Sequence, residues 1–352
     1  MKRLLIFALA LLTVLTGCKR EEVKPDQGYL FAVKQNGRFG YCDTSGNIVI
    51  PPQYQAAAIF SEGLAAVYVD GKVGYIDTKG TMVIPPTFVT GMIFRDGRAA
   101  VERDGKWGYI DRSGKIVIDP EFVATFAFSE GVAAVHVAKG GIVKAGFIDK
   151  GGKFAMKPQY DDASHFSEGL AAVKIGDKHG YIDKKGTMVI PPSFYAAAMF
   201  HEGRAMVKVN GKFGIIGFID RTGKEVVRPQ YQDGTNFHDG VAAVQKQNGK
   251  WLLIDTEGKQ ILDKEFDAPT IFTEGLAPVM DGKKAGYMDK KGKMVIKPQF
   301  DGASIFVNGV APVKVGEKCG YIDTKGNWVL KPELEWDQHT IDMYTSYYTT
   351  FK

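Results

Sequence analysis

The chain has 352 residues and a formal net charge of +5, with 45% hydrophobic and 24% charged residues. These proportions are ordinary for globular proteins, which excludes a disordered chain, a collagen-like fibre and a multi-span membrane protein. Glycine is the exception, because 42 glycines make about 12% of the chain against the usual ~7%. Proline, with 15 residues, is not enriched, so the glycines do not belong to a low-complexity linker.

Residues 1–17 have the pattern of an export signal. A basic start precedes an uncharged, mostly apolar run from Leu4 to Leu15, which is too short to span a bilayer comfortably. The run ends in the letters LTGC, which resemble the lipobox of bacterial lipoproteins. The resemblance implies that Cys18 is lipidated and holds the protein on a membrane. The alternative is an ordinary secretory signal with a chance cysteine.

Residues 18–27 are polar and predict a short tether behind the lipidated cysteine. In lipoproteins an Asp after the cysteine favours the inner membrane, so Lys19 indicates the outer membrane or the cell surface. Removal of the signal takes away two cations and leaves a net charge of +3. That charge is too small to indicate a nucleic-acid partner.

A pattern of about 34 residues recurs nine times between residues 28 and 334. Each copy carries a word such as Gly74-Tyr75-Ile76-Asp77, followed after three residues by another glycine, here Gly80. A proline and two aromatic residues follow at fixed spacing. The repeated positions hold 26 of the 42 glycines, so the excess reflects one hairpin design used nine times.

The pattern resembles the WG repeat family, also called KWG repeats. Residues 106–111 (KWGYID) match the core word of that family fully, and most copies keep the Gly-aromatic-Ile-Asp part. The tryptophan is mostly replaced, and the seventh copy keeps Trp251 but has Leu252 for the glycine and Lys264 for the proline. The resemblance covers all nine copies. It implies a repeat architecture with an unsettled binding role.

Each unit predicts a three-stranded β-meander. In residues 63–96, strands are expected at 63–70, 73–77 and 82–84, with Pro85 and Pro86 ending the third because proline cannot donate to a ladder. The connector that follows carries Phe88 and Phe94, which we expect to pack between units. One unit cannot bury a core alone, so neighbouring units must stack.

The predicted fold is therefore all-β, with the nine units stacked as an open solenoid or superhelix over residues 28–334. The array begins and ends in frame, with no split unit to join its ends, and nine units exceed the about four to eight blades of usual propellers. A closed propeller-like ring is the alternative. The tail, residues 335–352, is rich in Tyr and Thr and predicts a β-rich cap.

Cys42 lies in the first unit and Cys319 in the ninth. An exported protein can form disulfides, but these two cysteines would be neighbours only in the ring. The sequence leaves open whether they pair, because disulfide geometry is specific.

The repeated aspartates favour a structural role over catalysis or calcium binding. In an Asp-x-x-Gly turn the carboxylate accepts hydrogen bonds from backbone amides two residues on. Lys79, inside the turn that Asp77 begins, argues against a calcium loop.

A second set of acids precedes the glycine that opens each unit, with Asn308 in the last unit. It comprises Glu62, Asp96, Glu130, Glu168, Glu202, Asp239 and Glu274. Seven acids at one position would form an interaction stripe for basic or hydroxyl-rich ligands. The alternative is that each carboxylate accepts backbone hydrogens within its own turn.

His201 and His238 share one position in adjacent units, so we expect them to lie close together. No third ligand stands at metal spacing, and the sequence predicts no metal, no cofactor and no catalytic residue. Three units are lengthened at the same place, over 136–146, 208–217 and 245–251. Insertions in a stack gather on one face, often the binding face.

Two functions fit these observations. The first is an exported, membrane-anchored lipoprotein, not an enzyme, whose repeats bind an envelope protein or cell-wall glycan. The second is a glycan-active hydrolase on a propeller, because Asp-x-x-Gly turns also resemble those of sialidase-type propellers. That enzyme would need Arg and acids clustered in a few units, and the sequence shows no such arrangement.

Overall fold

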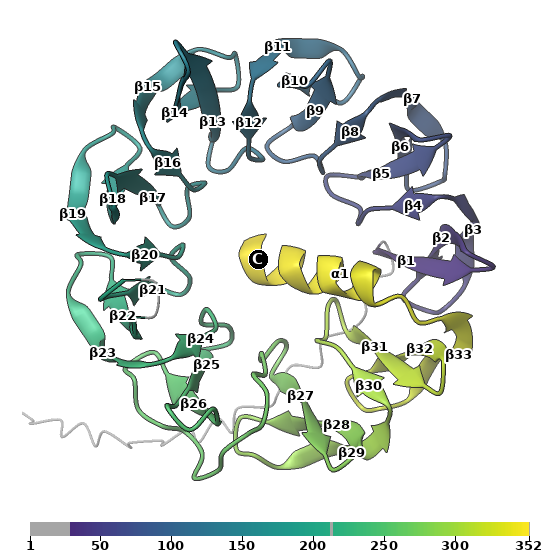
Figure 1. Ribbon diagram of the computed structural model, residues 1–352. Helices are drawn as coiled ribbons and strands as arrows, with labels where there is room; N and C mark the ends of the chain where they lie inside the picture. Colours follow the sequence, from purple (N-terminus) through teal and green to yellow (C-terminus); the bar gives the residue numbers. More distant parts are fainter. Residues whose placement is uncertain (1–28, 212–213, 352) are drawn as a thin grey trace, which may run out of the picture.

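The computed structural model describes residues 29–211 and 214–351, and these residues form nine sheets arranged in a closed ring (Figure 1). We number the sheets as blades 1–9 in chain order. The expected open solenoid is wrong, and the fold is the alternative, a ring with the form of a nine-bladed β-propeller. Residues 1–28, with the export signal and tether, lie outside the described residues.

Within a complete blade the strands follow one another from the ring's centre to its rim. Seven blades have a two-residue inner strand: β4 (Ala56–Ala57), β8 (Thr90–Gly91), β12 (Ala124–Thr125), β16 (Asp162–Ala163), β20 (Ala196–Ala197), β24 (Asp233–Gly234) and β30 (Gly302–Ala303). The second strands are β1 (Leu30–Gln35), β5 (Leu64–Val69), β9 (Ala99–Arg103), β13 (Val132–Lys139), β17 (Leu170–Ile175), β21 (Arg204–Lys208), β25 (Val241–Gln245), β27 (Leu276–Asp281) and β31 (Val310–Val315).

The third strands carry the Gly-aromatic-Ile-Asp word. They are β2 (Arg38–Asp43), β6 (Lys72–Asp77), β10 (Lys106–Ile110), β14 (Ile142–Asp149), β18 (Lys178–Asp183), β22 (Ile216–Asp220), β26 (Trp251–Asp255), β28 (Lys284–Asp289) and β32 (Lys318–Asp323). Eight outer strands complete the sheets: β3 (Ile48–Tyr54), β7 (Met82–Phe88), β11 (Ile116–Phe122), β15 (Phe154–Tyr160), β19 (Met188–Phe194), β23 (Glu225–Tyr231), β29 (Met294–Phe300) and β33 (Trp328–Glu335).

The inner strands correct the expectation of three strands per unit. The connector that follows each outer strand except β33 pairs with the second strand of the next blade, as Ala56 of β4 does with Tyr68 of β5. Six blades therefore have four strands, and blades 1, 7 and 8 have three. Because each connector belongs to the next sheet, the chain itself ties neighbouring blades together.

The outer strands continue through the prolines that were expected to end them, since β7 runs from Met82 to Phe88. Proline is tolerated there because the strand lies at a sheet edge. The pairing of β6 with β7 shifts register beside Gly74. A Cβ atom at Gly74 would lie only 2.7 Å from the carbonyl oxygen of Ile84. The repeated strand glycine therefore makes room for the bulged outer strand.

The aspartate turns form as the sequence predicts. Asp77 Oδ1 accepts hydrogen bonds from the backbone amides of Lys79 at 2.9 Å and Thr81 at 2.8 Å. Hydrogen bonding from Thr81 holds the pKa of Asp77 below its usual range. Gly80 closes the turn with a φ of +83°. Equivalent pairs of bonds occur in all nine described turns, which confirms their structural role.

Aromatic residues join neighbouring blades, as expected for Phe94. The ring of Tyr75 on β6 lies 5.1 Å from that of Phe94, which belongs to the loop of the next blade. The Tyr75 hydroxyl donates a hydrogen bond to the carbonyl of Met92 at 2.8 Å. Both rings are fully buried, so the pair supplies apolar burial and edge-on aromatic contact between blades.

Blades 9 and 1 close the ring without sharing a strand. The ring of Phe31 on β1 lies 5.4 Å from that of Tyr321 on β32, whose hydroxyl donates to Ala32 O at 3.4 Å. The other eight units hold Ala at the position of Phe31. Phe31 therefore replaces the connector phenylalanine that no preceding blade supplies. The open stack was expected because no unit is split, but side-chain packing makes the junction instead.

Cys42 and Cys319 belong to the apolar core of this closing junction, so the ring does bring their units together. Both are buried free thiols. Burial raises the pKa of each thiol to about 12, which keeps both protonated and unreactive at neutral pH.

The tail forms a helix, α1 (Gln338–Phe351), which corrects the expected β-rich cap. The helix lies across the centre of the ring (Figure 1). It is held beside blade 1 by an ion pair of 3.1 Å between Lys34 and Asp337, and Ile341 is buried. A closed ring has no end blade for a further strand to cover, so the tail packs on the channel. No helix among the described residues is long and apolar enough to cross a membrane.

Candidate functional site

The seven acids of the predicted stripe lie in the loops that precede the second strands β5, β9, β13, β17, β21, β25 and β27, which we call the channel loops. Each accepts a hydrogen bond from the backbone amide of the corresponding glycine in the next blade, whereas the sequence-based alternative placed this bond within its own turn. The bonds join Glu62 to Gly97 (2.9 Å), Asp96 to Gly131 (2.8 Å), Glu130 to Gly169 (3.1 Å), Glu168 to Gly203 (3.0 Å), Glu202 to Gly240 (2.8 Å), Asp239 to Gly275 (2.6 Å) and Glu274 to Gly309 (3.0 Å).

These acids adopt an uncommon backbone conformation. Their φ angles lie between 50° and 54°, and the glycine that follows each also has a positive φ. Two consecutive positive φ angles make the tight hairpin turn that usually favours Asn-Gly or Asp-Gly. A Glu costs about 1 kcal/mol or more in this conformation. The charge-assisted hydrogen bond to the next blade offsets that cost.

A cavity of about 350 Å³ lies among the channel loops of blades 3–7, beside Thr350 of α1. Arg95, His165, His201 and His238 contribute to its lining. The imidazole rings of His201 and His238 lie 5.4 Å apart, which confirms that they approach each other. Nε2 of His201 is buried without a hydrogen-bond partner among the described residues.

The histidines of this cavity are neutral at physiological pH. Burial, with smaller effects from Arg95 and His201, lowers the pKa of His165 to about 4. Burial and the neighbouring His201 lower that of His238 to about 4 as well. Burial also lowers the pKa of His201 itself. The cavity thus offers neutral imidazoles, one guanidinium and the carboxyl groups of Glu130, Glu168 and Glu202, a set suited to hydrogen bonding. Among the described residues, no group of three His, Cys, Asp or Glu is placed to hold a metal ion.

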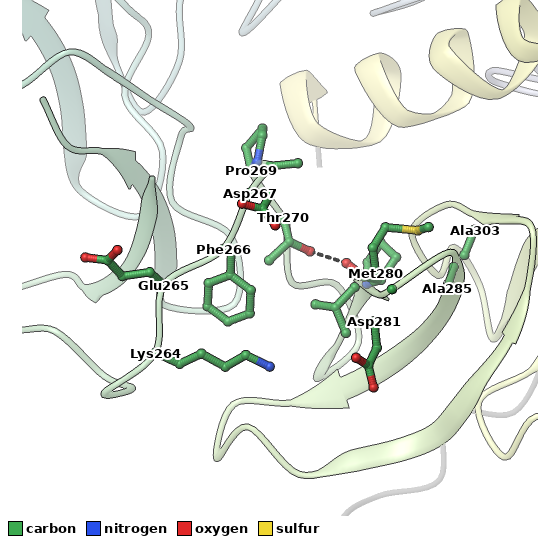
Figure 2. A pocket seen from close by; sticks show the side chains of 14 residues that line it. Lys264, Glu265, Phe266, Asp267, Pro269, Thr270, Met280, Asp281, Ala285 and Ala303 are labelled. Atoms are coloured by element: carbon green, nitrogen blue, oxygen red, sulfur yellow. Dashed lines mark hydrogen bonds between the residues drawn. The ribbon is translucent and has the colours of Figure 1, made fainter. Parts of the chain in front are cut away.

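A second and larger cavity, of about 440 Å³, is a groove between blades 7 and 8 (Figure 2). Residues 264–270 form one side and residues 278–282 of β27 and its turn form the other. The ammonium of Lys264 lies 5.4 Å from the centre of the Phe266 ring, and Met280 is 55% exposed. The sequence analysis did not identify this groove.

Leu252 explains why the groove opens at this blade. It occupies the strand position that is glycine in every other unit, where a Cβ atom would meet the outer strand. Residues 260–266 accordingly keep only isolated bridges to β26, at Trp251 and Ile254, and form no regular outer strand. The sequence therefore contained a signal for the groove, namely the loss of the strand glycine.

One of the three predicted insertions borders this groove. Lys246, in the insertion 245–251, forms an ion pair of 2.7 Å with Glu265, and Lys250 forms another with Asp267. The insertion 136–146 lengthens the hairpin of β13 and β14 in blade 4, far along the ring. The third, 208–217, includes residues 212–213, outside the described part of the chain.

The sequence profile of the WG containing repeat matches nine segments of the chain. These are residues 39–72, 74–107, 107–137, 146–178, 180–213, 216–251, 253–284, 286–319 and 320–336. The chain belongs to the WG containing repeat family. This confirms the resemblance seen in the sequence. A matched segment such as 39–72 begins on β2 of blade 1 and ends on β6 of blade 2, so one WG repeat spans two blades.

The chain is similar to solved structures at low sequence identity. A eukaryotic initiation factor is 11% identical, with a TM-score of 0.56 over 80% of this chain and 88% of that one. BamB from Moraxella catarrhalis is 12% identical, with a TM-score of 0.45 over 76% and 91%. Dihydro-heme d1 dehydrogenase NirN is 16% identical, with a TM-score of 0.47 over 78% and 75%. No curated protein matches the sequence.

Proposed function

We propose that the chain is an exported, lipid-anchored protein whose propeller is a non-enzymatic binding surface for another envelope protein or for cell-wall glycan. The lipobox resemblance at Cys18 supports export and anchoring, and Lys19 favours the outer membrane or cell surface. The groove between blades 7 and 8 is the observation that carries the binding role. It has the concave shape, partly apolar lining and charged rim of a binding site.

The channel supports binding over repeated catalysis. Each of the seven acids accepts a hydrogen bond from a neighbouring blade, so a structural requirement accounts for their repetition. The predicted interaction stripe remains part of the proposal. A carboxylate that accepts one hydrogen bond keeps further acceptor positions, which can face a ligand in the channel.

The test combines fractionation with capture. Full-length protein should remain with membranes after a high-salt wash, and Cys18→Ala should release it. The mature chain, immobilised as residues 19–352, should retain a component of solubilised envelope or bind purified wall sacculi. Membrane association of the Cys18→Ala protein would refute the anchor, and failure of both captures would refute the binding role.

The alternative function is a glycan-active hydrolase. Its catalytic residues would lie in the cavity that Arg95, the histidines and the channel acids line. A panel of glycosides tests it. Product release that Glu168→Gln abolishes, in a protein that still folds, would replace the binding role with hydrolysis.

A further inference from the structure

The inner edge of β27 lacks the strand that covers the same edge in seven other blades. In blade 2 the amide of Gln55 donates to Tyr68 O at 3.0 Å, and that of Ala58 donates to Ala66 O at 2.9 Å. Met280 and Pro278 are the corresponding residues of blade 8. Neither carbonyl receives such a backbone hydrogen bond from the residues that the structure describes. The hydroxyl of Thr270 instead donates to Pro278 O at 2.6 Å.

Pro269 accounts for the missing strand. It occupies the second position of the inner strand, where blade 2 has Ala57 and blade 6 has Ala197. Its ring fixes φ at about −65°, away from the about −140° of an antiparallel strand, so residues 267–270 do not adopt the conformation of that strand. Residues 267–270 therefore leave β27 uncovered and form the opposite side of the groove (Figure 2).

The backbone groups of the uncovered edge indicate which class of ligand it can bind. A strand edge presents a row of backbone donors and acceptors, and an extended polypeptide satisfies them by adding as a further strand. The seven blades that have an inner strand show that a two-residue extended segment fits this position. A glycan is less suited, because it would stack on an aromatic face and Lys264 lies over the ring of Phe266.

We infer that the groove between blades 7 and 8 binds an extended segment of a partner polypeptide, which adds to β27 as the inner strand of blade 8. This inference rests on the proposed binding role and narrows it to a protein partner. The backbone of Met280 supplies the hydrogen bonds at the strand edge. The partner's small or apolar side chains occupy the groove beside Phe266 and Val279.

A peptide with the sequence of residues 193–199 (SFYAAAM) serves as the probe, because this segment includes β20 of blade 6. Labelled peptide should bind the mature chain saturably in fluorescence anisotropy and protect the Met280 amide from hydrogen exchange. The same peptide with Ala198→Pro lacks the amide that donates to Met206 O in blade 6, and it should not bind. Absence of saturable binding, or equal binding of both peptides, would overturn the inference.

Variants of the protein test the edge itself. Met280→Pro removes the backbone donor and should weaken peptide binding by about tenfold, whereas Met280→Ala keeps the backbone and should change it by less than about twofold. Should Met280→Pro fail to fold, Pro269→Ala replaces it. That change gives position 269 the alanine that blades 2 and 6 have there. It should let residues 267–270 cover β27, and it should therefore also weaken peptide binding. Unaltered binding by Pro269→Ala or by folded Met280→Pro would contradict the inference.

Envelope capture separates this inference from the broader proposal. If the unaltered chain captures a protein and Met280→Pro or Pro269→Ala does not, both are supported. If every variant captures it equally, or if the captured component is glycan, the binding role stands and the strand-addition site is wrong. If the unaltered chain captures nothing, the binding role itself fails.

Discussion

Two junctions of the ring depart from the repeat, and their departures have opposite results. Between blades 9 and 1, Phe31 replaces a repeated alanine and fills the space against Tyr321. Between blades 7 and 8, Leu252 replaces a repeated glycine and Pro269 interrupts an inner strand. The first departure completes a contact, and the second leaves a groove of about 440 Å³.

The comparison shows that the effect of a single residue depends on the contact that the regular repeat makes at the same position. An added side chain stabilises a junction where the regular contact is missing, as with Phe31. An added side chain displaces the neighbouring strand where the backbone already occupies the space, as with Leu252. The effect of a substitution in this ring therefore depends on its place in the blade more than on its hydrophobicity.

The largest expected effect on stability comes from a substitution that disrupts the closing junction between blades 9 and 1. Phe31 is 3% exposed, and Phe31→Ala should lower the free energy of unfolding by about 3–5 kcal/mol, because it leaves a cavity against Tyr321. Urea unfolding measures the loss, and hydrogen exchange should locate the weakened strands in blades 1 and 9. Phe154→Ala is the matched control, since Phe154 is 37% exposed. Equal losses for the two variants would show that the closing junction contributes little.

The second prediction transfers the residue of blade 7 to a regular blade. Gly74→Leu should lower the free energy of unfolding by about 1–3 kcal/mol, because the new side chain meets the carbonyl of Ile84. Hydrogen exchange should show loss of protection along β7. Lys72→Leu, at an exposed position of the same strand, should leave β7 protected. If Gly74→Leu leaves it protected too, Leu252 is not the cause of the groove.

The third prediction concerns the pH dependence of stability that histidines in the channel loops produce. His165 and His238 have folded-state pKa values of about 4, below the about 6.5 of an exposed histidine. The unfolded chain therefore binds more protons between these values, and stability falls as the pH drops through this window. The slope is at most about 1.4 kcal/mol per pH unit for each histidine.

Urea unfolding at about pH 7.5 and about pH 5 measures this loss. His165→Asn should reduce the difference between the two pH values, whatever it does to stability at neutral pH. An unchanged pH difference in His165→Asn would contradict the assignment.

Much of the local structure could be predicted because it depends on residues close in sequence. Asp77 and Gly80 specify their turn within four residues. The Gly-aromatic-Ile-Asp word identifies the third strand of a blade. The inner strand could not be found in this way, since Ala56 and Ala57 follow the outer strand of blade 1 in the chain but pair with β5 of blade 2. Ring closure likewise depends on the angle between blades and on one side chain, Phe31, which no periodic pattern specifies.

The site was predicted in part for the same reason. The channel acids were found because they recur, and their exposure to a common channel follows from the repeat. Their partners were missed because each bond crosses to the next blade, as from Glu62 to Gly97. The groove was missed because it forms where two residues, Leu252 and Pro269, depart from the repeat. The structural result of these departures is seen only by comparison with the other units.

The closing junction has a consequence for how such rings can change in size. Because blade 1 and blade 9 each keep their own strands, no sheet is assembled from both ends of the chain. Duplication or deletion of one complete unit in the gene would add or remove one whole blade, with no sheet left short of strands. The number of blades can then vary between relatives by whole units, while the two terminal blades retain the residues that join them.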